Sequence, residues 1–329
     1  MIKGTQRRIM RNILVIGSAG QIGSELIPEL RKRYGSDHVV AGIHKTQLSR
    51  EVAESGPIET IDITEVNRIS DVVKRYHIDT IYNLAALLSV VGESKPLEAW
   101  HVGIDGLLNV LEVAREYRCS VFTPSSIGAF GISTPLDNTP QDTIQRPGTI
   151  YGITKVAGEL LSDYYFERFG VDTRSVRYPG IISSVTLPGG GTTDYAVEIF
   201  YAAIKEKRYV CPLKRGTYLD MMYMPDCLNA AIQLMEADPA RLRHRNSFNV
   251  TAMSFAPEMI EAEIKTHIPD FAMGYKIDPV KQKIAESWPN KMDDSCAREE
   301  WDWNPKYDLA MTTQEMLAVI KQKRDKGTL

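Results

Sequence analysis

A glycine-rich turn near the N-terminus constrains the fold of this 329-residue chain more than any other feature. The apolar run 12–16 leads directly into Gly17-Ser-Ala-Gly20-Gln21-Ile22-Gly23, and helical periodicity follows at once. A strand, a GxxGxxG turn and a helix in this order are the context of a dinucleotide-binding fingerprint. The first glycine permits the tight turn, the second lets backbone approach a pyrophosphate, and the third lets the helix pack on the strand. The turn therefore predicts a dinucleotide site that includes Gly17, Gly20, Gln21, Ile22 and Gly23, with a ligand-free turn as the alternative.

Strand and helix patterns alternate through the first half of the chain. The expected strands are 12–16, 39–43, 58–63, 80–84, 120–122 and 173–178, and the expected helices include 69–76, 100–117 and 151–169. Nearly all-apolar strands that alternate with helices indicate an α/β fold with a doubly wound parallel sheet. We expect residues 1–182 to form the Rossmann-like nucleotide-binding domain.

The pattern changes after Pro179. The segment 187–191 is too rich in proline and glycine for regular structure, and a helix is expected over 193–207. We expect residues 183–329 to form mainly a smaller substrate-binding lobe over the C-terminal edge of the sheet, where open α/β sheets bind ligands. Residues 210–250 are expected to return to the first domain, so the two lobes would be interleaved.

Charge and composition exclude several classes of protein. The net charge is −3, so nothing favours nucleic acid or an anionic membrane as a partner. The four cysteines form no CxxC or CxxH cluster, which argues against a zinc site or a disulfide framework. No apolar run approaches the ~20 residues of a membrane span, and the basic start, Met1 to Met10, lacks the apolar core of a secretory signal. We expect a cytoplasmic protein without a metal.

A tyrosine and a lysine four residues apart are the strongest catalytic candidates. Tyr151 and Lys155 would share one helix face, and an ammonium beside a phenol favours the phenolate, a base near neutral pH. The alternative is a half-exposed aromatic ring beside a solvated lysine. Ser125 and Ser126 follow the fifth strand, so their hydroxyls are expected at the same edge of the sheet, unless they only form a serine-rich turn. Together these residues favour a hydroxyl of this serine pair as the group that hydrogen-bonds a substrate oxygen.

Other residues are expected along the cofactor. Leu84, Ala85 and Ala86 end the fourth strand with small side chains where a flat ring could pass, and Ser89 follows at the same rim. The second strand ends in Gly42-Ile-His44-Lys45, without the acidic residue that binds the adenosine ribose of NAD. The preference for NAD over NADP therefore stays open. Asp62, followed by Ile63, would accept from the adenine amino group or would cap a helix before Thr64.

These motifs resemble the extended short-chain dehydrogenase/reductase superfamily, and several segments are similar to its L-threonine 3-dehydrogenases, which are UDP-galactose 4-epimerase-like. The segments are TPSSIGAFG at 123–131, YGITK at 151–155, RYPGII at 177–182, PGGGTTDYA at 188–196, DMMY at 220–223, AMSF at 252–255 and AESWP at 285–289. The resemblance covers nearly the whole chain, and PGGGTTDYA is its most specific segment.

The resemblance implies oxidation of L-threonine at C3 to 2-amino-3-oxobutyrate, with NAD as cofactor. It assigns Tyr151 as the general base and Ser126 as its hydroxyl partner, while Lys155 lowers the pKa of Tyr151 and binds the nicotinamide ribose. Tyr178 and Ile181 would line the nicotinamide carboxamide. The substrate-facing residues would be Ser89, Ser126, Tyr151, Thr192, Thr193, Asp194 and Trp288. The resemblance also implies a homodimer through two helices, one from Trp100 to Tyr117 and one from Tyr151 to Phe169.

Two positions depart from the family pattern. Gly42 stands where an acidic residue is usual, and Gly103 stands where the superfamily often has asparagine. Two other functions remain to be weighed. A sugar-nucleotide epimerase or dehydratase would share the serine, tyrosine and lysine, but it needs cationic groups for a diphosphate. A dinucleotide-binding redox sensor without catalysis would typically lack the tyrosine or the lysine.

Overall fold

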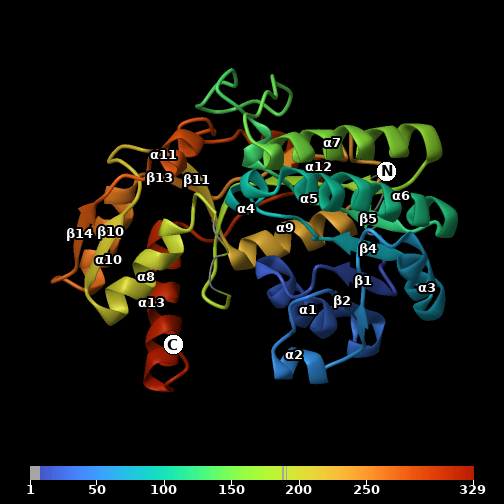
Figure 1. Ribbon diagram of the computed structural model, residues 1–329, viewed down its shortest axis with the longest axis horizontal. Coiled ribbons are helices and arrows are strands. Elements are labelled where there is room, and N and C mark those ends of the chain that lie inside the picture. The colour runs from blue at the N-terminus through green and yellow to red at the C-terminus, as the bar shows by residue number, and fades with distance from the viewer. Residues whose placement is uncertain (1–7, 187–188, 190) are drawn as a thin grey trace, which may run out of the picture.

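Six parallel strands form the central sheet of the protein in a computed structural model, which describes residues 8–186, 189 and 191–329 (Figure 1). The strands are, from edge to edge, β3 (Ile58–Thr60), β2 (Val39–Ile43), β1 (Ile13–Ile16), β4 (Thr80–Asn83), β5 (Ser120–Phe122) and β7 (Thr173–Arg174). The order reverses beside β1, as it does in a doubly wound sheet. The predicted fold class is confirmed.

Helices cover both faces of this sheet because its strands are apolar on both sides. In β1, Leu14 and Ile16 pack into the core that contains α3 (Val66–Tyr76) and α6 (Gly106–Tyr117). Ile13 and Val15 pack on the other face, against α1 (Gln21–Tyr34) and α9 (Met224–Glu236). Alternation of side chains along the strand thus fills two cores, and α9 reaches the sheet from late in the sequence.

Two predicted elements are interrupted in the structure. The strand expected over 173–178 breaks at Ser175 into β7 and β8 (Val176–Tyr178), and β8 pairs instead with β6 (Ser125–Ser126) and β12 (Phe248–Asn249). The break arises because the backbone of Ser175 bonds to Arg245 and Phe248. The helix expected over 100–117 consists of α5 (Pro96–Trp100), a π-helical turn (His101–Asp105) and α6.

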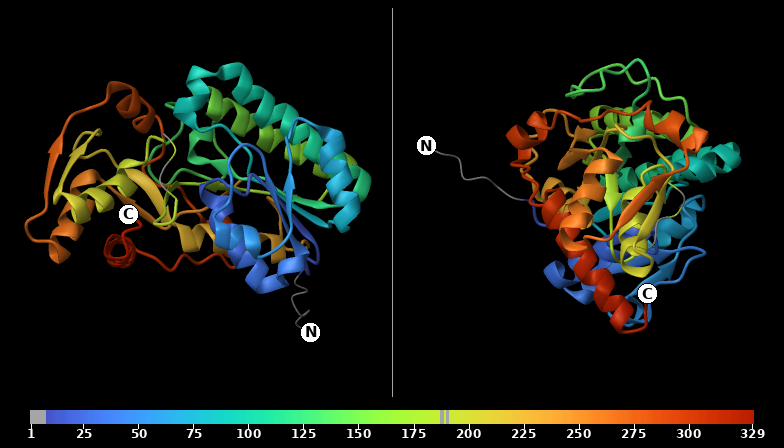
Figure 2. Two further views of the ribbon diagram at one scale, coloured as in Figure 1. Left: turned by 60° about the horizontal axis from the view of Figure 1, so that its bottom comes forward. Right: turned by 90° about the vertical axis from the view of Figure 1, so that its left-hand side faces the viewer.

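A second group of elements forms its own apolar core beside the sheet (Figure 2). It contains α8 (Tyr195–Lys205), α10 (Pro257–His267), α13 (Leu309–Asp325) and the parallel pair β10 (Arg208–Cys211) and β14 (Ala272–Tyr275). Another small sheet has the order β13 (Met253–Phe255), β11 (Leu219–Tyr223) and β9 (Gly180–Ile182). The remaining helices of four or more residues are α2 (Arg50–Glu54), α4 (Ser89–Ser94), α7 (Ile150–Phe169), α11 (Pro279–Ala285) and α12 (Ser295–Trp301).

Some expectations are refined and others stay open. The helix expected over 193–207 is α8, which is shorter at both ends, and the third and fourth strands end earlier than expected. The division into residues 1–182 with 210–250 and residues 183–329 stays a prediction. Most of the basic start, residues 1–7, and three residues of the segment expected to be irregular (187, 188 and 190) lie outside the described residues. No described helix is long and apolar enough to cross a membrane.

Candidate active site

The glycine turn between β1 and α1 leaves the first amides of the helix open to a ligand. Gly17 has a φ of 85°, a conformation that other residues rarely adopt. The amides of Gly17 and Ser18 donate to the carbonyl of Gly42 at 3.0 and 3.1 Å, which ties the turn to β2. A Cβ on Gly23 would lie 2.5 Å from the Gly17 carbonyl, so only glycine lets the helix pack this closely. Gly20 caps α1 without a side chain, and the first turn has no acidic residue. This geometry fits a pyrophosphate at the positive end of the helix.

One cavity of about 290 Å³ joins this turn to the predicted catalytic residues. Its wall includes most of the residues that the sequence predicts for the site: Gly17, Gly20, Gln21, Ile22, Gly23, Leu84, Ala86, Ser89, Ser126, Tyr151, Lys155, Tyr178, Ile181, Thr192, Thr193, Asp194 and Trp288. The wall also includes Leu88, Pro124, Ser125, Ile127, Pro179, Gly180 and Gly191, which the predicted set lacks. Each of these residues lies within two positions of a predicted residue in the sequence. This closeness in sequence is the signal that would have found them.

Four residues predicted for the adenosine end do not line this cavity. His44 and Lys45 are exposed, and His44 Nε2 lies 3.4 Å from Asp62 Oδ2. Asp62 Oδ1 accepts from the amide and hydroxyl of Thr64 at 2.9 and 2.7 Å, and the Thr64 amide is the main reason why the pKa of Asp62 is lowered. Because α3 begins only at Val66, Asp62 closes a turn and is not the helix N-cap. The side chain of Ile63 packs in the core beside α6.

The predicted catalytic tyrosine, Tyr151, is positioned by the first turn of α7. The helix N-cap is Thr149, whose hydroxyl accepts from the amide of Gly152 at 3.1 Å. The ring of Tyr151 lies so near Gly128 that a Cβ there would be 3.1 Å from the ring. Ser126 Oγ accepts from the amide of Gly128 at 3.1 Å, which holds the serine hydroxyl at the end of β6. Tyr151 and Ser126 therefore lie side by side in the cavity.

Lys155, which the sequence predicts to lower the pKa of Tyr151, lies beside the ring of that tyrosine. Its Nζ donates to the carbonyl of Pro124 at 2.7 Å and lies 5.4 Å from the centre of the Tyr151 ring. Burial raises the pKa of Tyr151, and the hydrogen bond with Ser126 only opposes this. Burial also lowers the pKa of Lys155 to about 8, against the attraction of Glu159. Desolvation is thus the largest influence on the pKa of both groups.

The loop before α8 brings polar groups to the same cavity. Asp194 Oδ2 accepts from the amide of Gly191 at 2.6 Å, which shapes the turn. The hydroxyl of Thr192 is buried and has no hydrogen-bond partner among the described residues. Gly180 makes room for Thr193, because a Cβ at position 180 would lie 2.7 Å from the Thr193 side chain. A buried hydroxyl without a partner costs free energy unless a ligand satisfies it. This feature fits a polar substrate.

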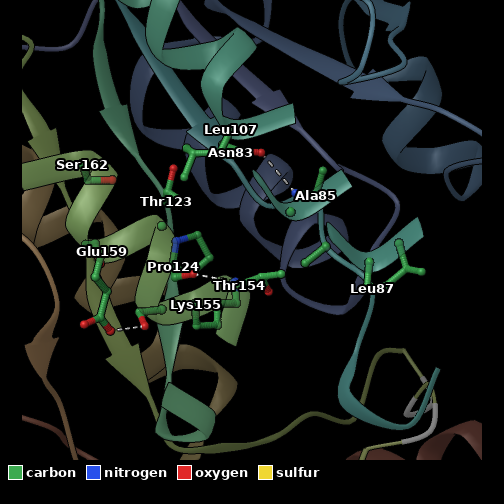
Figure 3. Close-up of a pocket in the computed structure, with 16 residues that line it drawn as sticks. Asn83, Ala85, Leu87, Leu107, Thr123, Pro124, Thr154, Lys155, Glu159 and Ser162 are labelled. Carbon is green, nitrogen blue, oxygen red and sulfur yellow. Dashed lines mark hydrogen bonds between the residues drawn. The ribbon is translucent and has the colours of Figure 1, made fainter. Parts of the chain in front are cut away.

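A small cavity of about 30 Å³ lies behind Lys155, between α7 and the ends of β4 and β5 (Figure 3). Ala85, predicted to contact the cofactor, lines this second cavity instead, and its amide donates to Asn83 Oδ1 at 3.3 Å. Gly103 of the π-helical turn also lines it, and a Cβ there would lie 3.2 Å from the Cβ of Thr154. Gly103 thus lets the π-helical turn approach α7 directly beside Lys155.

A buried ion pair that the sequence did not reveal lies one helical turn beyond Lys155. Glu159 of α7 and Arg177 of β8 are each 6% exposed and form two contacts at 2.8 and 3.0 Å. Glu159 also accepts from the hydroxyl of Ser125 and from Gln145, the latter at 2.8 Å. Arg177 donates further to the Gln141 carbonyl at 2.7 Å. The pair connects the catalytic helix, the strand beside it and the loop before α7.

A dinucleotide turn and a Ser–Tyr–Lys set in one cavity, at the C-terminal edge of a doubly wound sheet, define an extended short-chain dehydrogenase/reductase. A sequence model of the NAD dependent epimerase/dehydratase family matches residues 13–251, and the chain belongs to this family.

Individual relatives match almost the whole chain. A Staphylococcus aureus (strain USA300) protein described as an uncharacterized epimerase/dehydratase is 52% identical over 95% of this chain and 98% of its own. The structure of L-threonine dehydrogenase from Clostridium difficile is 54% identical, with a TM-score of 0.95 over 96% of this chain and 99% of that chain. A monomeric L-threonine 3-dehydrogenase from a metagenome is 41% identical, with a TM-score of 0.89 over 94% of this chain and 99% of that chain.

The buried pair predicts a large loss of stability when one partner loses its charge. In Glu159→Gln the guanidinium of Arg177 stays buried without a counter-charge, so we expect the free energy of unfolding to fall by about 3–5 kcal/mol. Chemical unfolding measures this change. The control is Glu54→Gln, which removes one side of the exposed Arg50–Glu54 pair and should have little effect. A loss for Glu159→Gln no larger than that of the control would contradict a stabilising role for the pair.

Proposed function

We propose that this protein is an L-threonine 3-dehydrogenase, which oxidises the C3 hydroxyl of L-threonine to give 2-amino-3-oxobutyrate and reduces NAD⁺. The observation that carries the proposal is the single cavity that contains the glycine turn, Ser126, Tyr151, Lys155 and the polar loop 191–194. The high identity to the L-threonine dehydrogenase of Clostridium difficile over nearly the full length of both chains supports the same substrate.

The charges of the cavity favour an amino acid over a sugar nucleotide. Lys155 is the one basic side chain on the described part of the wall, and Asp194 is the one acidic side chain there. A sugar nucleotide would bring a second diphosphate, which needs arginine or lysine partners of its own. A zwitterion needs only a few polar groups. We assign Asp194 to the substrate ammonium and the hydroxyls of Ser89, Thr192 and Thr193 to its polar atoms, with Trp288 closing the pocket.

NAD fits the remaining part of the cavity. The amides of Gln21 and Ile22, at the start of α1, would hold its pyrophosphate, and Lys155 would bind the nicotinamide ribose. Ile181 and the backbone at Tyr178 would face the carboxamide; the Tyr178 hydroxyl does not, because it donates to the carbonyl of Cys227 at 2.7 Å. When bound, NAD⁺ supplies the hydride acceptor and a positive charge at the nicotinamide.

The residues of the chain supply the proton chemistry. Ser126 Oγ accepts from Gly128 and is hydrogen-bonded to Tyr151, and we assign its own proton to the C3 oxygen of the bound substrate. Tyr151, as phenolate, takes the proton of the C3 hydroxyl, because hydride leaves C3 only as the alkoxide forms. Lys155 stabilises the phenolate by its positive charge. The cytoplasmic location expected from the sequence stays a prediction.

Replacing the base tests the assignment. We expect Tyr151→Phe to lower kcat with L-threonine by about 10²–10⁴-fold, because the proton acceptor is lost. NAD⁺ affinity should stay within about threefold, since the amides that hold the pyrophosphate are untouched. NADH absorbance measures kcat, and calorimetry measures affinity. Tyr164→Phe, on the exposed side of the same helix, is the control. An unchanged rate in Tyr151→Phe would refute the base, and wild-type protein inactive on L-threonine but active on a sugar nucleotide would refute the function.

The raised pKa of Tyr151 predicts a rate that increases with pH. Only the phenolate accepts a proton, so raising the pKa moves the active form to alkaline pH, and kcat/KM should rise from about pH 7 to about pH 9. Lys155→Met removes the nearby positive charge, and the rise should then shift to higher pH. The ionisation of the substrate affects the pH profiles of the wild type and of Lys155→Met equally, so the difference between them reports on the enzyme. Superimposable profiles would contradict the electrostatic role of Lys155.

We propose that two copies associate through α5 and α7. These helices expose large apolar side chains: Leu97, Trp100, Ile153, Leu160 and Tyr164. Leu97 is 85% exposed and Leu160 is 63% exposed, which is unusual for leucines gathered on adjacent helices and fits an apolar interface. The helices expected from the sequence, 100–117 and 151–169, include α6, but these exposed residues lie on α5 and α7.

A charge placed in this surface should separate the copies. We expect the wild type to have the mass of a dimer, and Leu160→Glu to raise the dimer dissociation constant at least about tenfold by burying a carboxylate. Light scattering after size exclusion measures both masses. Ile132→Glu, at an exposed position outside these helices, should leave the dimer intact. A monomeric wild type, as in the metagenome relative, would overturn the proposal.

A further inference from the structure

Three groups of the metal-ligating kind meet outside the cavity of the proposed active site. His244 lies between α9 and β12, and Cys296 and Glu300 lie one turn apart on α12. One ligand atom from each of them lies within 4.8 Å of the other two. The proposed catalytic chemistry uses none of these side chains. The sequence argued against zinc because the cysteines form no cluster, but here the partners come from distant segments.

The two nitrogens of His244 have different surroundings. Its Nδ1 is hydrogen-bonded to Glu300, whose side chain is 2% exposed and also accepts from the amides of Arg243 and His244. Its Nε2 lies 4.0 Å from Cys296 Sγ and 3.6 Å from Asp142 Oδ2. A carboxylate on one ring nitrogen fixes the ring and leaves the other nitrogen to bind a cation. The ring is thus held with Nε2 toward a thiol and a carboxylate.

We propose that His244, Cys296 and Asp142 bind a divalent zinc ion, with Glu300 orienting the histidine. In a tetrahedral zinc site, bonds of about 2.0–2.3 Å place neighbouring ligand atoms about 3.3–3.8 Å apart. The 3.6 Å between Nε2 and Asp142 Oδ2 lies within this range, and the 4.0 Å between Nε2 and Cys296 Sγ needs only a small closure. Imidazole, thiolate and carboxylate together favour zinc over magnesium or calcium, which prefer oxygen alone. Water supplies the fourth ligand, and the thiol proton passes to solvent when the Zn–S bond forms.

The charges around the cysteine also suit a cation. The carboxylates of Glu300, Asp293 and Glu299 lie near Cys296, together with the guanidinium of Arg243. Arg243 pairs with Glu299 at 3.0 Å and approaches Glu300 at 3.4 Å. The described acidic groups here outnumber this arginine. A zinc ion would neutralise the excess negative charge and stabilise the thiolate.

Zinc at this position would join three segments. Asp142 is exposed and follows Gln141, whose side chain bonds to the Ser247 carbonyl at 2.8 Å and accepts from the Asn249 amide at 2.9 Å. The Gln141 carbonyl accepts from Arg177, the partner of Glu159 beneath the active site. The ion would therefore fasten the loop before α7 to α12 and to the segment before β12. This role is structural, and it does not depend on the proposed dehydrogenase activity.

Cobalt substitution tests direct ligation. Tag-free, metal-stripped wild-type protein titrated with Co²⁺ should show a thiolate-to-cobalt charge-transfer band that saturates at one equivalent, and Zn²⁺ should displace it. Cys296→Ser should abolish the band, and Asp142→Asn should weaken Zn²⁺ affinity at least about tenfold. Asp71→Asn, an exposed carboxylate on α3, is the matched control and should change nothing. Absence of the band, or a band that persists in Cys296→Ser, would overturn the proposal.

Thiol labelling gives a second readout. Cys119, Cys211 and Cys227 are buried, so Cys296 should account for the fast reaction with a thiol reagent. We expect Zn²⁺ to slow this reaction at least about tenfold in the wild type and much less in Asp142→Asn. Zn²⁺ should also raise the melting temperature of the wild type by a few degrees. Equal protection of the wild type and Asp142→Asn would show that the aspartate is not a ligand.

Discussion

The buried ion pair between Glu159 and Arg177 is the interaction on which the active site most depends. A carboxylate and a guanidinium this far from water are stable only when every remaining donor and acceptor is satisfied. Ser125, Gln145, Gln141 and Asn249 supply those partners. In doing so they fix the start of α7 against β6, β8 and the loop before the helix. Tyr151 and Lys155 stand on that same helix, so the pair sets where the base and its cation lie relative to Ser126.

The sequence was most informative where chemistry is local. A glycine turn between a strand and a helix has one common geometry, and Gly17, Gly20 and Gly23 adopt it. Ser126, Tyr151 and Lys155 were likewise predicted together, because strands of a parallel sheet end at one edge. The family resemblance then added the loop from Thr192 to Asp194, which the residue pattern alone did not assign.

What the sequence missed depends on contacts between distant segments. Ile63 looked like a cofactor residue but packs in the core, and the hydroxyl of Tyr178 is taken by the carbonyl of Cys227. The strand at 173–178 breaks because Ser175 pairs its backbone with a segment some 70 residues later. The spacing of residues in the sequence does not reveal the cluster of His244, Cys296 and Glu300 for the same reason. Gly103 is intelligible only in three dimensions, where it lets two helices touch beside Lys155.

Tyr151, the proposed base, lies in surroundings that oppose its ionisation. Burial raises the pKa of Tyr151, and Lys155 Nζ donates a hydrogen bond to the backbone carbonyl of Pro124. The charges of bound ligands must therefore favour the phenolate of Tyr151. We propose that a hydride passes from C3 of L-threonine to NAD⁺ in this cavity. A reaction with [3-²H]-L-threonine tests this transfer most directly. We expect the deuterium to appear in NADH and kcat/KM to fall relative to the value for the unlabelled substrate. Deuterium lost to water or retained in the product, with none in NADH, would contradict it.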